Sequence, residues 1–179
     1  NKIPLKILKS KIKNQIYQRN LGINFLSKKI DILLQLDDRV ILHKNCIKEL
    51  LNCWNKSKSN TVGIGINQIY KNKYFDLFHL FSSFFNLNGK VYGLGFNFNY
   101  FNLKKNLDVM WLKGGLSAWC LKKNIRIKNR KFPNWTWCVN EDVEYSLGKK
   151  KDEILFVCCK AKASLIDPKK KKLENIQNY

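Results

Sequence analysis

Short apolar runs alternate with amphipathic segments along most of this chain. The run 31–36 is mainly aliphatic and stops at Asp37 and Asp38, which is typical of a strand that ends at a sheet edge. Apolar residues within 45–55 recur at i, i+3, i+4 and i+7, and predict an amphipathic helix. Residues 61–69 alternate as in another strand. This succession predicts an α/β fold with a mostly parallel mixed central sheet flanked by helices.

The same patterns predict further elements on both sides of this unit. Expected strands cover 3–8, 89–96, 108–112 and 154–159, and expected helices cover 11–20, 74–87, a short stretch ending at 122 and a segment opening at 140–143. Phenylalanine and leucine dominate 74–87, which we interpret as a buried helix, with a helix lying in a membrane interface as the alternative. We expect a single domain over 1–166 and a basic tail over 167–179.

Charge and composition narrow the class of protein. The chain has 179 residues, 45% of them hydrophobic, which is enough for a real core. It carries 34 Lys and Arg against 13 Asp and Glu, a net charge of +21 that favours contact with polyanions. Most of the excess is dispersed lysine, whereas arginine, which suits bidentate recognition of bases, is scarce. We therefore expect a solvated basic surface and no specific nucleic-acid partner.

Cysteine usage and the ends of the chain bear on location. The six cysteines form no Cys-x-x-Cys pair and no zinc pattern with the two histidines, so we expect reduced core residues and a cytoplasmic protein. The sequence shows no signal peptide, and no apolar run reaches the roughly 18 residues of a spanning helix. Because the chain opens at Asn1 without an initiator Met, we expect a fragment.

The adjacent carboxylates of Asp37 and Asp38 are the first candidate for chemistry. In open α/β sheets, ligands bind in the crevice beyond the carboxyl ends of the strands, where this pair would stand. Two neighbouring carboxylates repel each other and favour a cation such as Mg²⁺ or Mn²⁺. Taken alone, the pair is more typical of an Asp-rich turn after a strand, and the other motifs of the chain favour the chemical interpretation.

Four short segments, taken together, carry a more specific signal. They are Gln18-Arg19-Asn20-Leu21-Gly22, Leu36-Asp37-Asp38, Trp111-Leu112-Lys113-Gly114-Gly115, and Trp137 to Asp142. In this order and spacing they resemble the family 2 glycosyltransferases, over residues 11 to 163. The resemblance implies a Rossmann-like A-type fold that binds nucleotide-diphosphate sugars. It also implies transfer of the sugar, with inversion, to a hydroxyl acceptor in cell-surface polysaccharide or glycolipid synthesis.

The resemblance also implies roles for individual residues. Asp142 becomes the catalytic base, and Asp38 the ligand of a divalent cation, Mg²⁺ or Mn²⁺. Donor-binding residues would be Arg19, Asn20, Asp37 and Asp38, and acceptor-binding residues would be Gly114, Gly115, Trp137 and Glu141. The implied partners are a nucleotide-sugar donor and a saccharide or lipid-linked acceptor. A peripheral contact with the inner face of the cytoplasmic membrane is a further expectation.

Two departures from the family pattern leave other functions open. Arg39 stands where many relatives have a third acidic residue, and the family's first strand and helix have no counterpart before Asn1, so we expect an N-terminally incomplete domain. An inactive relative is therefore one alternative. A basic nucleic-acid-binding domain is a second, and a metal-dependent phosphoesterase built on the four acidic residues of the site is a third.

Overall fold

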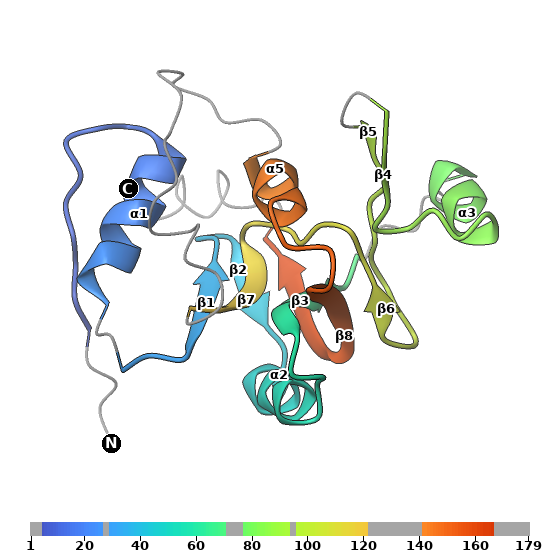
Figure 1. The fold of residues 1–179 in the computed structure, drawn as a ribbon, viewed down its shortest axis with the longest axis horizontal. Coiled ribbons are helices and arrows are strands. Elements are labelled where there is room, and N and C mark those ends of the chain that lie inside the picture. Colours follow the sequence, from blue (N-terminus) through green and yellow to red (C-terminus); the bar gives the residue numbers. More distant parts are fainter. Residues whose placement is uncertain (1–4, 27–28, 71–76, 94–95, 122–140, 167–179) are drawn as a thin grey trace, which may run out of the picture.

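The computed structural model describes residues 5–26, 29–70, 77–93, 96–121 and 141–166. Within them the chain has an α/β fold with a mixed central sheet flanked by helices (Figure 1). The helices are α1 (Gln15–Phe25), α2 (Cys46–Asn55), α3 (Leu77–Phe84) and α5 (Glu141–Leu147). The strands are β1 (Ile32–Leu36), β2 (Val40–Leu42), β3 (Thr61–Gln68), β4 (Val91–Tyr92), β5 (Phe96–Asn97), β6 (Leu107–Asp108), β7 (Leu116–Cys120) and β8 (Ile154–Leu165).

The main sheet has the order β1-β7-β3-β8-β2, with β6 also paired to β8, and β4 and β5 form a separate hairpin. Of the pairings between described strands, β3 with β8 is parallel and the others are antiparallel. The expectation of a mostly parallel sheet is therefore wrong, in part because β2 and β6 are antiparallel to β8 and in part because of β7. This strand lies between β1 and β3 and runs antiparallel to both of them.

The segment that forms β7 was expected to be helical, and this expectation is also wrong. Residues 116–119 are fully buried, so the strand lacks the polar and apolar alternation that marks a half-exposed strand. A short buried run of this kind does not distinguish a strand from a helix by its periodicity. Of the expected strand over 108–112, only Asp108 lies in a strand, at the end of β6. The described part of the expected strand over 3–8 has no regular secondary structure.

Several predicted elements are confirmed, among them the strand that organises the candidate site. β1 ends at Leu36, and Asp37 begins a tight turn in which the Val40 N–H donates to the Asp37 carbonyl at 3.2 Å. The helix predicted over 45–55 is α2, and the strand predicted over 61–69 is β3. The first turn of α5 contains Glu141 and Asp142, as carboxylates at a helix N-terminus favour.

Two apolar layers cover the sheet, with α5 and α2 on opposite sides of the central strands (Figure 1). Val143 of α5 belongs to one layer and Leu50 of α2 to the other. On the α5 side, Gly63 leaves no room for a side chain, because a Cβ there would lie 2.8 Å from Leu112 Cδ1 and 2.9 Å from Trp119 Cε3. The glycine thus lets Leu112 pack directly on β3 and fixes the start of the loop that carries Gly114.

Two further expectations are corrected. The aromatic helix is not buried: Phe81 and Phe84 of α3 are 52% and 79% exposed. The cysteines are not all reduced either, because Cys53 and Cys158 form a disulfide between α2 and β8. The disulfide removes the cysteine-based reason for a reducing compartment. Among the described helices, none combines the length and apolarity that crossing a bilayer demands. The expected tail over 167–179 lies outside the described residues.

Candidate functional site

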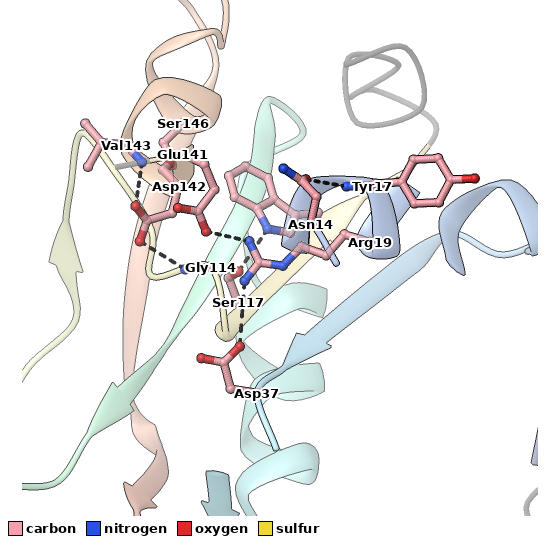
Figure 2. A network of polar contacts seen from close by, with 11 residues as sticks. Asn14, Tyr17, Arg19, Asp37, Gly114, Ser117, Glu141, Asp142, Val143 and Ser146 are labelled. Carbon is pink, nitrogen blue, oxygen red and sulfur yellow. Dashed lines mark hydrogen bonds and ion pairs between the residues drawn. The ribbon is translucent and has the colours of Figure 1, made fainter. Parts of the chain in front are cut away.

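Four chain segments that are distant in sequence meet at the carboxyl end of β1 (Figure 2). Arg19 comes from α1 and Asp37 follows β1, while Gly114 lies in the loop before β7. Glu141 and Asp142 open α5. The antiparallel pairing of β1 with β7 produces this meeting, because Leu36 at the end of β1 faces Leu116 at the start of β7. The loop that carries the glycines therefore arrives beside the carboxylate that follows β1.

Arg19 connects the carboxylates of the two distant acidic segments. Its Nη1 donates to Glu141 Oε1 at 2.9 Å, and its Nη2 lies 3.6 Å from Asp37 Oδ1. The side chain of Glu141 is 11% exposed and that of Asp37 is 38% exposed, so the bond to Glu141 is the better shielded of the two. Arg19 therefore supplies one positive charge between two carboxylates at the centre of the site.

Asp142 is held by backbone groups from two elements. Its Oδ2 accepts from the Gly114 N–H at 3.3 Å, and its Oδ1 accepts from the Val143 N–H at 2.9 Å. Ser146, which is fully buried, donates from Oγ to the Asp142 carbonyl at 2.6 Å and accepts from the Leu112 N–H at 3.0 Å. Ser146 thus ties the first turn of α5 to the loop before β7 and fixes the position of Asp142.

Gly114 and Gly115 lie where a larger residue would clash with the charged side chains of the site. A Cβ on Gly114 would lie 2.9 Å from Arg19 Nη1, and a Cβ on Gly115 would overlap the Asp37 carboxylate. The Asp37 N–H also donates to the Gly115 carbonyl at 3.1 Å. Because neither glycine carries a side chain, the backbone of this loop comes directly against the charged groups.

A small cavity lies beside these groups. Arg19, Asn20, Gly114 and Asp142 contribute its polar lining, and Trp119 is among its apolar lining residues. Its volume of about 30 Å³ is room for one or two water molecules. A ligand as large as a nucleotide would therefore bind over the rim of the cavity and not inside it.

Lys113 is a titratable group beside this site to which the sequence analysis assigned no role. Its Nζ donates to Gln68 Oε1 at 2.6 Å and to the Tyr100 carbonyl at 2.7 Å, and lies 4.8 Å from the centre of the Tyr100 ring. Burial lowers the pKa of Lys113 from its ordinary value of 10.5 to about 7, although the negative charge of Asp142 acts in the opposite direction. In the sequence, the position of Lys113 directly before Gly114 and Gly115 was the one feature that could have drawn attention to it.

The remaining predicted residues are spread around this centre. Asn20 lines the cavity, whereas Asp38 and Arg39 lie exposed in the turn between β1 and β2. Trp137 lies outside the described residues. The structure thus brings together Arg19, Asp37, Gly114, Gly115, Glu141 and Asp142, and their individual roles stay predictions.

The predicted divalent-cation site depends on Asp38. In the described part of the chain, no group of three or more His, Cys, Asp or Glu side chains could hold a metal ion. A single exposed carboxylate still fits Mg²⁺, because this ion commonly takes one or two protein carboxylates and completes its shell with water and substrate phosphates. The metal site at Asp38 therefore stays a prediction that requires a bound phosphate ligand.

Chemically, the site offers fixed carboxylates, a guanidinium and a glycine loop whose backbone is open to close approach. Such a set can bind a phosphorylated ligand and accept a proton from a hydroxyl group. Comparisons of the chain with protein-family models, curated proteins and solved structures give no match.

Proposed function

We propose that this chain is an inverting glycosyltransferase domain of the family 2 type, with an A-type fold. In this proposal it transfers a sugar from a nucleotide-diphosphate donor to a hydroxyl of a saccharide or lipid-linked acceptor in cell-surface polysaccharide or glycolipid synthesis. The observation that carries the proposal is the Arg19 bridge between Asp37 and Glu141, with Asp142 alongside. Acidic groups that the resemblance assigns to the donor and acceptor sides therefore share one site.

On the donor side, the residues supply positive charge and close backbone approach. Arg19 offers guanidinium N–H groups to phosphate oxygens and can exchange its long contact with Asp37 for them, because that contact spans 3.6 Å. Gly114 and Gly115 allow the diphosphate or the sugar to lie against the loop. In this arrangement Asp37 and Asn20 border the donor, which is consistent with the position of Asn20 in the cavity wall.

On the acceptor side, Asp142 acts as the general base. It takes the proton from the acceptor hydroxyl while that oxygen forms a bond to the anomeric carbon, and the bond from this carbon to the diphosphate oxygen breaks. Attack from the face opposite the leaving group inverts the anomeric centre. The hydrogen bonds from Gly114 and Val143 keep the carboxylate in place, and Glu141 orients Arg19 toward the leaving group. Trp137 is proposed as an acceptor contact.

The proposed function also includes a divalent cation. Asp38 would hold Mg²⁺ or Mn²⁺ together with diphosphate oxygens, and the ion supplies positive charge to the departing nucleoside diphosphate when it is bound. Arg39, which lies in the same exposed turn, adds a second positive charge close in sequence to the proposed ion.

A calorimetric titration with a panel of nucleoside diphosphates, with and without Mn²⁺, tests the donor site. We expect Arg19→Met to weaken binding under both conditions and Asp38→Ala to remove the Mn²⁺-dependent part. Asp152→Ala is the matched control, because this exposed aspartate precedes β8 near the start of β3, at the opposite end of the sheet. Binding that ignores Arg19 and Asp38 but falls steeply with salt for any nucleic acid would instead support a basic nucleic-acid-binding domain.

The catalytic assignment needs its own readout. For a donor and acceptor pair that the protein uses, we expect Asp142→Asn to retain the affinity for the nucleoside diphosphate and to lose sugar transfer. An Asp142→Asn variant that transfers sugar at the original rate would remove Asp142 as the base.

A further inference from the structure

Helix α3 buries a serine and leaves aromatic rings exposed, unlike an ordinary surface helix. Ser82 is 2% exposed, while Phe84 is 79% exposed. Ser82 Oγ donates to Asn88 Oδ1 at 2.8 Å, and Asn88 Nδ2 donates to Ser83 Oγ at 2.8 Å. The serines therefore anchor the helix to the chain that follows it, and the phenyl rings are left outside. The exposed rings therefore do not serve the chain's own hydrophobic core.

The exposed rings form a cluster at one end of the molecule. Phe81 and Phe85 have ring centres 4.5 Å apart, and the rings of Phe84 and Phe85 meet edge to face at 5.1 Å. The β4–β5 hairpin lies at the same end (Figure 1) and adds exposed Tyr92 and Phe96. We name this set the aromatic platform; it comprises Leu80, Phe81, Phe84, Phe85, Tyr92 and Phe96, all of them at least half exposed.

The charged residues within the stretch of sequence that carries the aromatic platform are positive. No Asp or Glu occurs in the sequence between Asp76 and Asp108. Lys90 directly precedes β4, and the exposed Lys104 and Lys105 lie in the loop that follows the hairpin. Exposed aromatic rings accompanied by lysine, without acidic groups to repel an anion, are the chemistry of a surface that enters the headgroup region of an anionic bilayer. A neutral or basic protein groove would not require this bias.

We propose that the aromatic platform is a membrane-docking surface that inserts the rings of Phe81, Phe84 and Phe85 into the interface of an anionic bilayer. The lysines contact lipid phosphates, and the hydrogen bonds between Asn88 and the two serines hold the helix in the docking orientation. The inference does not depend on the glycosyltransferase proposal, because it uses no residue of the Arg19 site.

Vesicle sedimentation tests the platform. We expect the protein to bind vesicles of phosphatidylcholine with phosphatidylglycerol and to bind pure phosphatidylcholine vesicles more weakly. Replacing Phe81, Phe84 and Phe85 by serine should lower the partition coefficient about tenfold or more. The matched control replaces three exposed apolar residues elsewhere, Ile41, Ile47 and Leu51, by serine, and should bind like the parent.

Three results would overturn the inference. One is equal vesicle binding by the platform variant and the control, and another is no preference of the parent for anionic vesicles. The third is a parent that is dimeric in size-exclusion chromatography and a platform variant that is monomeric, because a second copy would then cover the rings. If the triple variant does not fold, the same vesicle assay is done with the single variant Phe84→Ser, because Phe84 is the most exposed of the three rings. Nucleoside diphosphate titration of the same variants should be unchanged, which separates this inference from the proposed function.

Discussion

Replacing Arg19 by methionine deletes the charge that joins the two acidic segments while keeping most of the apolar stem. The carboxylate of Glu141, with its side chain 11% exposed, then loses a partner at 2.9 Å and regains little water. Asp37, with its side chain 38% exposed and its contact at 3.6 Å, recovers its hydration more easily. The structure therefore places most of the effect of the substitution on Glu141.

The magnitude follows from this partial burial. Breaking a fully buried ion pair costs about 3–5 kcal/mol, and an exposed pair contributes about 0.2–1 kcal/mol. The Arg19 network lies between these limits, so Arg19→Met should lower the free energy of unfolding by about 1–3 kcal/mol. A urea titration followed by tryptophan fluorescence measures this change.

A double-mutant cycle separates the two contacts of Arg19. We expect a coupling free energy of about 1–2 kcal/mol between Arg19→Met and Glu141→Gln, and less than about 0.5 kcal/mol between Arg19→Met and Asp37→Asn. A coupling to Glu141 that is no larger than the coupling to Asp37 would refute the geometry of the bridge.

Three further predictions concern the surroundings of the site. Gly115→Ala should lower the free energy of unfolding by about 1–3 kcal/mol because its Cβ overlaps the Asp37 carboxylate, whereas Gly22→Ala in α1, which has nothing within 4 Å of its Cβ, should raise it by up to about 1 kcal/mol. Equal effects on the urea midpoint would contradict the close approach of the loop. Because Lys113 has a pKa of about 7 when folded and 10.5 ordinarily, the unfolded chain binds more protons between these values, and the parent should gain about 1 kcal/mol per pH unit over Lys113→Met as pH rises above 7. If the free energies of unfolding of the parent and of Lys113→Met changed in parallel with pH, Lys113 would not be the group that causes the pH dependence. Cys53→Ser should lower the free energy of unfolding by about 2–4 kcal/mol, and thiol labelling of denatured, unreduced protein should leave Cys53 and Cys158 unmodified; labelling of both would disprove the disulfide.

Local patterns were enough to predict β1, which leads into the candidate site, and α2, which packs on the other side of the sheet. The aliphatic run before Asp37 and the helical spacing within 45–55 each depend on neighbouring residues, and the structure confirms β1 and α2. The ordered motifs also named residues that the fold brings together, including Arg19 and Glu141. Their order along the chain carried this information, since each motif alone has an ordinary structural explanation.

Properties set by distant contacts could not be predicted. The antiparallel insertion of β7 depends on its pairing with β1 and β3, which no local pattern of residues 116–120 reveals. The exposure of Phe84 follows from which side of α3 its serines anchor, and the disulfide follows from the packing of α2 against β8. The perturbed pKa of Lys113 likewise depends on burial that arises only in the folded chain.

The central claim is that one site, built around Arg19, lies between the acidic turn after β1 and the start of α5 and binds the sugar donor. A crystal structure of the protein with Mn²⁺ and the nucleoside diphosphate that binds most tightly tests this claim most directly. We expect an anomalous peak beside Asp38, with the diphosphate within hydrogen-bonding distance of Arg19 and its terminal phosphate facing Asp142. A nucleotide bound elsewhere on the surface, with Arg19 still bridging Asp37 and Glu141, would contradict it.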